Sequence, residues 1–131
     1  MDVPRARSVN QPAPNDWTET RGMPVDLAHL RRYTLGDKAL EAEVLELFLA
    51  QLPETIASLR SASTERDWKI AAHTLKGSSR AIGAWRIATL AQEAEELSTG
   101  SEPAAWSEAI SKLEMAASEA QAFVRETAAR T

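Results

Sequence analysis

The chain contains no cysteine, which excludes disulfide bonds and thiolate metal sites and is compatible with a cytoplasmic location. Long hydrophobic runs are also absent, so we expect no membrane-spanning helix, and the N-terminus has no apolar segment of the signal-peptide kind. The chain has no excess of positive charge either. Its 15 basic and 19 acidic residues give a net charge of −4, which argues against nucleic acid as a partner.

Hydrophobic residues make up 44% of the 131 residues, which is enough for the core of one domain. Residues 1–22 are rich in proline and asparagine and lack apolar periodicity, so they are predicted to form a flexible tail. Residues 23–131 are predicted to form the folded domain.

Apolar spacing and capping residues in this domain predict helices and no strand. The expected helices are a short one over 27–34 after Asp26, a long one after Asp37, one from about 64–67 to 81, one over 85–98, and one starting at Pro103. Pro53 is expected to kink the long helix. The prediction is an all-α fold, an antiparallel up-and-down four-helix bundle with an additional short N-terminal helix.

The helix before Gly83 has one polar, basic face. Successive helical residues turn by about 100°. A broad sector of this helix is expected to face the core: Ile70, Ala71, Thr74, Leu75, Ser78, Ala81 and Ile82. His73 lies nearly opposite its centre, surrounded by Arg66, Lys69, Lys76 and Arg80.

This setting suits a histidine that carries a phosphoryl group. A neutral imidazole nitrogen is a nucleophile at physiological pH, since the ordinary histidine pKa is about 6.5. Lys76, one turn along, can form a charge-assisted hydrogen bond to an anionic product. Gly77 costs the helix roughly 1 kcal/mol relative to alanine, and it leaves space for a partner to reach the imidazole. Two plainer explanations remain open: the cations form an ordinary solvated face, and Gly77 permits close helix packing.

The stretch His73-x-Leu75-Lys76-Gly77-Ser78-Ser79-x-x-x-Gly83-Ala84 closely resembles the signature of histidine-containing phosphotransfer (HPt) domains of bacterial two-component phosphorelays. The resemblance covers about residues 24–127. It implies that His73 accepts a phosphoryl group from a receiver-domain aspartyl phosphate and relays it to another response-regulator receiver. It further implies phosphorylation at the ring nitrogen distal from the backbone.

The resemblance also implies roles for neighbouring residues. Lys76 would stabilise the phosphoryl group, and Gly77 would give the receiver access. Lys69, Arg80 and Arg66 are candidates for receiver docking. Many family members orient the histidine with a polar side chain from the following helix; Glu95 is one candidate here and Gln92 is the alternative.

The partners implied by this resemblance are response-regulator receiver domains, including the receiver of a hybrid histidine kinase. The receiver would supply Mg²⁺, so we expect no cofactor and no metal site in this chain. We expect a monomeric, cytoplasmic phosphoryl carrier. Autophosphorylation from ATP is not expected, because the chain has no glycine-rich phosphate loop.

Two other functional classes remain open from the sequence. A binding-only module would dock on a receiver or kinase through the same basic face without carrying phosphate. A metal-binding bundle enzyme would need two Glu-x-x-His motifs and two further glutamates. The chain offers only the single imperfect copy Asp26-x-x-His29, which makes this class the weakest of the three.

Overall fold

The computed structural model describes residues 23–130, all of whose regular elements are helices. They are α2 (Leu27–Thr34), α3 (Lys38–Ser61), α4 (Glu65–Ile82), α5 (Trp85–Glu95) and α6 (Pro103–Arg130). The all-α prediction is therefore confirmed. The tail predicted for residues 1–22 lies outside the described residues. Among the described helices, none is long and apolar enough to cross a membrane.

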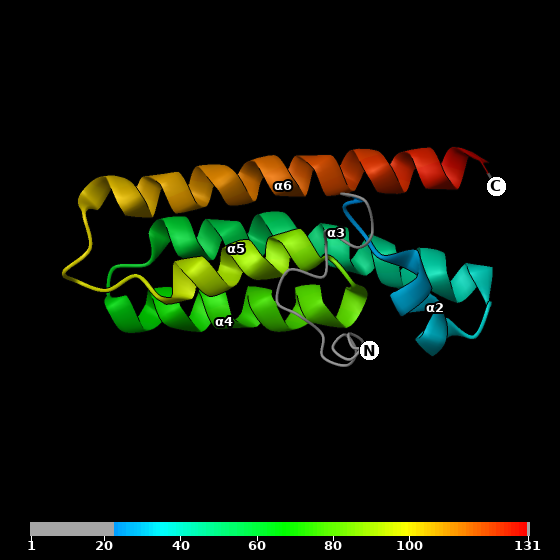
Figure 1. The fold of residues 1–131 in the computed structure, drawn as a ribbon, viewed down its shortest axis with the longest axis horizontal. Coiled ribbons are helices and arrows are strands. Elements are labelled where there is room, and N and C mark those ends of the chain that lie inside the picture. Colours follow the sequence, from blue (N-terminus) through cyan, green and yellow to red (C-terminus); the bar gives the residue numbers. More distant parts are fainter. Residues whose placement is uncertain (1–22, 131) are drawn as a thin grey trace, which may run out of the picture.

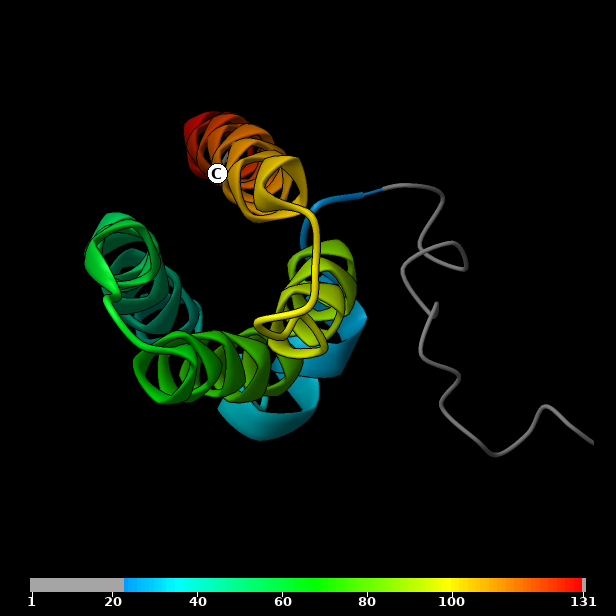
Figure 2. The same cartoon turned by 90° about the vertical axis from the view of Figure 1, so that its left-hand side faces the viewer.

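Helices α3 to α6 alternate in direction and form a four-membered ring, with short α2 set against one end (Figure 1; Figure 2). Each helix of the ring packs against its two neighbours, α3 against α4 and α6, and α5 against α4 and α6. Helix α3 continues through Pro53 to Ser61. The core lies inside the ring. Its most completely buried large side chains are Leu52, Leu59, Leu75 and Leu113.

Three helix starts have side-chain caps, of which the sequence predicted the two at Asp26 and Asp37. Carboxylate oxygens of Asp26 and Asp37 accept hydrogen bonds from backbone N–H groups in the first turns of α2 and α3. The Thr64 hydroxyl accepts from the N–H of Asp67 at the start of α4. These caps satisfy backbone donors that otherwise lack partners, and they place the helix starts close to the predicted positions.

Gly83 ends α4 in the left-handed conformation, with φ of 94°. A Cβ at this position would lie 2.9 Å from the carbonyl oxygen of Asp26. That close approach exists because the N–H of Asp26 donates to the Gly83 carbonyl at 2.9 Å. Glycine at residue 83 therefore serves both the turn between α4 and α5 and the attachment of the segment leading into α2.

The core face predicted for α4 is wrong in its orientation. Ile70, Thr74 and Ala81 are exposed, with 53% of Ile70 accessible to solvent. The buried residues are Trp68, Ala71, Ala72, Leu75, Ser79 and Ile82. Trp68 fills a large volume and packs edge-to-face on Trp106, with ring centroids 4.7 Å apart. The buried face of α4 is thus rotated toward Trp68 relative to the prediction.

The predicted end of the next helix also differs from the structure. Helix α5 ends at Glu95 rather than near residue 98.

A partly buried ion pair attaches α2 to α3. Arg31 donates from Nε to Oε1 of Glu41 at 2.8 Å and from Nη2 to Oε2 at 3.2 Å. The Glu41 side chain is 11% exposed and that of Arg31 is 43% exposed. The hydrogen bonds from Arg31 lower the pKa of Glu41 below its ordinary value, and they outweigh the opposing effect of burial.

We predict that Glu41→Gln lowers the free energy of unfolding at pH 7 by about 1 kcal/mol, a modest value because Arg31 is screened by solvent. The folded pKa of Glu41 lies below the unfolded pKa. Its contribution is therefore present above the unfolded pKa and is lost as the pH falls through the folded value. Denaturant unfolding from pH 7 to pH 3 measures the difference in unfolding free energy between the wild type and Glu41→Gln. Glu43→Gln is the control, because Glu43 is exposed. A Glu41→Gln deficit that stays constant over this range would contradict the prediction.

Candidate functional site

His73 projects from the solvent-facing side of α4, and 68% of its side chain is exposed. The opposite side of the helix carries Trp68, Ala72 and Ser79, which are buried. Packing of that apolar side against the bundle therefore presents the imidazole to solvent. The predicted exposure of His73 agrees with the structure, although the predicted core sector does not.

The imidazole is held from one side by Glu95 of the neighbouring helix α5. Nδ1 of His73 lies 3.1 Å from Oε2 of Glu95. An ionised carboxylate only accepts hydrogen bonds, so the neutral ring must carry its proton on Nδ1 to make this contact. Nε2 then has a free lone pair, on the ring nitrogen farther from the backbone. Of the two candidate orienting residues, Glu95 contacts the ring.

The other oxygen of the same carboxylate is bound by Lys76. The Lys76 ammonium lies 2.7 Å from Oε1 of Glu95, and it also donates to the side-chain oxygen of Gln92 at 2.9 Å. Gln92 in turn donates to Glu96 at 2.9 Å. The sequence did not predict that Lys76 is this enclosed, with 13% of its side chain exposed. Its spacing from His73 is that of one helical turn, as expected.

These contacts set the charge state of Glu95. The hydrogen bond from Lys76 is the largest influence and lowers the pKa of Glu95, the contact with His73 acts in the same direction, and burial opposes both. The carboxylate therefore stays ionised at neutral pH and continues to accept from His73 Nδ1.

Gly77 leaves a gap on the exposed side of α4, next to Lys76. A Cβ built at Gly77 would meet no atom of the described residues within 4 Å, outside the backbone of its own helix. Close packing of a neighbouring helix therefore does not account for this glycine. The space beside it is open to solvent, on the helix that presents His73.

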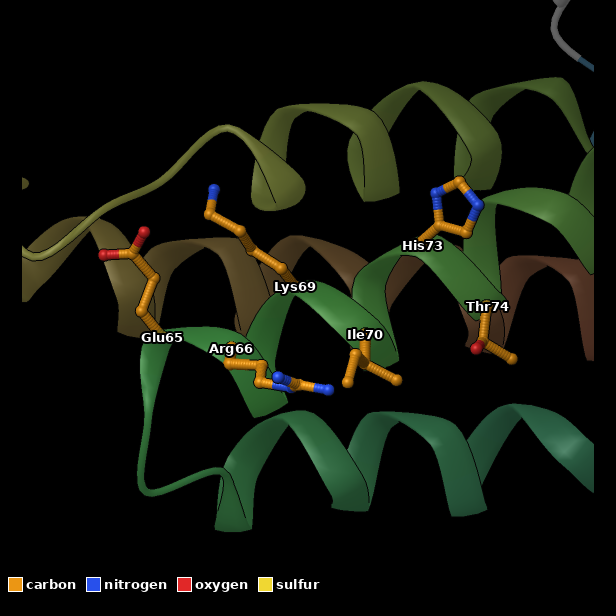
Figure 3. Close-up of a pocket in the computed structure, with 6 residues that line it drawn as sticks. All are labelled: Glu65, Arg66, Lys69, Ile70, His73 and Thr74. Carbon is orange, nitrogen blue, oxygen red and sulfur yellow. The ribbon is translucent and has the colours of Figure 1, made fainter.

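A groove with a volume of about 460 Å³ runs along α4 beside His73 (Figure 3). Its lining residues are Glu65, Arg66, Lys69, Ile70, His73 and Thr74. Arg66 is exposed in this groove, and Arg80 is exposed two turns beyond His73. The Lys69 ammonium has a different environment: it donates to the backbone carbonyls of Glu95 and Leu97 at 2.6 and 3.1 Å.

Ile70, which was predicted to lie in the core, is instead a lining residue of this groove. It borders this groove and also a second one between α3 and α4. A signal was available: Trp68 competes with Ile70 for burial, because the two lie too far apart around the helix to face the same core. If Trp68 is assigned to the core, the predicted buried face of the helix lies away from Ile70.

The alternative metal centre has no support in the geometry. The two carboxylate oxygens of Asp26 accept from the backbone N–H of His29 and from Nε1 of Trp85. Within residues 23–130, no group of three or more histidine, aspartate or glutamate side chains is arranged to hold a metal ion. Asp26 and His29 therefore serve the junction between α2 and the turn at Gly83.

Comparison with known protein families identifies residues 43–123 as matching the model of the Hpt domain. The matched segment includes most of α3, all of α4 and α5, and most of α6. Comparisons with curated proteins and with solved structures returned no match.

We predict that Gly77→Ala raises the free energy of unfolding by up to about 1 kcal/mol, because alanine is the better helix former and its methyl group meets open space. Thermal and denaturant unfolding measure this change. Gly83→Ala is the matched control and is expected to destabilise, since its Cβ would clash with the backbone at Asp26. Destabilisation by Gly77→Ala would mean that residue 77 is enclosed in solution.

Proposed function

Because this chain belongs to the Hpt domain family of phosphotransfer modules in two-component signalling, we propose that His73 carries a phosphoryl group between receiver domains of response regulators. The observation behind this proposal is the imidazole itself. It is exposed, its Nδ1 contacts an ionised carboxylate, and its Nε2 is the ring nitrogen that keeps a free lone pair. That combination makes Nε2 the nucleophile.

The transfer is a displacement at phosphorus. The Nε2 lone pair attacks the phosphorus of an aspartyl phosphate on the donor receiver, the N–P bond forms, and the P–O bond to the aspartate breaks. The departing group is the aspartate carboxylate. The reverse displacement passes the group to the next receiver. Such reactions need alignment and charge neutralisation more than covalent chemistry by the protein, and the receiver brings the Mg²⁺.

Within this proposal, Lys76 and Glu95 both stabilise phosphorylated His73, Lys76 at the phosphoryl group and Glu95 at Nδ1 of the ring. An ammonium has three N–H donors. In the described part of the chain, Lys76 uses one for Glu95 and one for Gln92, which leaves one for a phosphoryl oxygen. Glu95 holds the Nδ1 proton throughout, because Nε2 is the atom that reacts.

The proposed docking surface is the exposed side of α4. Gly77 provides room beside the imidazole, Arg66 and Arg80 supply positive charge, and Ile70 supplies an apolar contact between the two grooves. Cations around His73 favour encounter with an acidic receiver pocket, and this attraction weakens as salt is added. A relay protein exchanges partners, so a small interface of about 800 Å² per partner or less suits it.

Incubation with a phosphorylated receiver and Mg²⁺ tests the proposal. We expect an acid-labile, alkali-stable label on the protein that is abolished by His73→Gln. His29→Gln is the matched control, because residue 29 is the other of the two histidines, and it should retain the label. Stable docking of the receiver without any label would instead support a binding-only module.

We predict that Lys76→Met slows phosphoryl transfer or shortens the lifetime of phosphorylated His73 by about 10- to 100-fold. This range corresponds to the loss of one charge-assisted hydrogen bond. Time courses of label gain and loss measure it, with circular dichroism to verify the fold. Lys112→Met is the control, since Lys112 is an exposed lysine paired within α6. Unchanged kinetics in Lys76→Met would remove Lys76 from the mechanism.

A further inference from the structure

Helix α5 ends without the glycine that commonly satisfies the last carbonyl groups of a helix. Its C-cap residue, Glu96, has ordinary right-handed backbone angles. The backbone N–H groups of Glu96 and Leu97 bind carbonyls of the last turn, and side chains of α4 bind carbonyls at this end of the helix and just beyond it. Nε1 of Trp68 donates to the carbonyl of Ala94 at 2.6 Å. Nζ of Lys69 donates to the carbonyls of Glu95 and Leu97.

Charge adds to this attachment. The C-terminus of a helix carries partial negative charge from its unpaired carbonyls, and a cation placed there is stabilising. The Lys69 ammonium is such a cation, provided by the neighbouring helix. In Figure 3 its side chain extends from α4 toward the chain that follows α5, away from Arg66 and Ile70.

Three residues of α4 converge on the single residue Glu95. Lys69 binds its backbone carbonyl at 2.6 Å, His73 contacts Oε2 at 3.1 Å, and Lys76 pairs with Oε1 at 2.7 Å. Their spacings of four and three residues place them on one face of α4. The residue that contacts the imidazole is therefore held at its backbone as well as at its carboxylate.

We infer that Lys69, assisted by Trp68, is a positioning residue for His73: by fixing the end of α5 it fixes Glu95, which keeps the His73 proton on Nδ1 and leaves Nε2 unprotonated. The inference rests on the proposed function for its kinetic consequence, while its structural consequence stands alone. It differs from a docking role for Lys69, because two donors of the ammonium are already bound to backbone carbonyls.

The test combines ¹⁵N NMR of the His73 ring, which reports the tautomer, with transfer kinetics from a phosphorylated receiver. Lys69→Met should lower the fraction of neutral ring carrying its proton on Nδ1 and reduce the maximal transfer rate by roughly 3- to 10-fold. The receiver concentration at half-saturation should stay within about twofold. Lys69→Arg, which restores a cationic donor, should recover both the tautomer and the rate.

Arg66→Met is the matched control, because it removes one cation from the same groove without touching α5. It should leave the tautomer unchanged and raise the half-saturating receiver concentration. Trp68→Phe removes the other donor to α5 and keeps a ring in the core; it should shift the tautomer in the same direction as Lys69→Met. If Lys69→Met instead behaves like Arg66→Met, Lys69 is a docking residue and the inference is overturned.

The tautomer measurement needs no phosphoryl transfer, so the two proposals fail separately. A wild-type protein that takes no label on His73 would refute the proposed relay, and the NMR comparison would still decide the role of Lys69. A labelled wild type with an unchanged tautomer in both Lys69→Met and Trp68→Phe would refute the positioning role alone. Circular dichroism of each variant establishes that the compared proteins are folded.

Discussion

The carboxylate of Glu95 has two oxygens, and helix α4 binds both. His73 contacts one and Lys76 pairs with the other, so one acidic side chain joins the candidate nucleophile to the candidate counter-charge. The arrangement depends on Glu95 remaining ionised, which the hydrogen bond from Lys76 favours by lowering its pKa. Protonation of Glu95 would remove the negative charge that pairs with Lys76, and the carboxyl would no longer favour a proton on Nδ1 of His73.

The bundle serves this arrangement by holding α4 and α5 in register. Packing in the bundle buries Trp68, Ala72 and Ser79 on one side of α4, and His73 is exposed as a consequence. The small residues allow the helices to approach closely, and the tryptophan fixes how α4 is rotated. A candidate nucleophile on a helix, such as His73, keeps its orientation without a loop that must close over it. That property suits a carrier which two different partners must reach.

The sequence was sufficient for the helices and for the exposure of His73 on α4. Caps at Asp26 and Asp37 and the stop at Gly83 depend on local backbone geometry, so a single sequence predicts them well. The sequence was insufficient for the rotation of α4, because a broad apolar sector that includes Ile70 competes with one that includes Trp68.

Side-chain contacts between different helices could not be predicted from the sequence. The pattern gave Glu95 as the candidate for orienting the imidazole and Gln92 as the alternative; in the structure Glu95 contacts the imidazole and Gln92 binds Lys76. Lys69 is the clearest example. In the helical pattern it is one cation among four, yet its ammonium binds the end of the next helix rather than standing free.

The partners that surround His73 are near one another along the chain as well as in space. The contacts of Lys76, His73 and Lys69 with α5 and the residues just after it join residues 16 to 28 positions apart. Contacts of such short sequence separation require little loop-closure entropy and form quickly during folding. The helical hairpin of α4 and α5 therefore holds His73, Lys76 and Glu95 together through contacts that close only short loops of the chain.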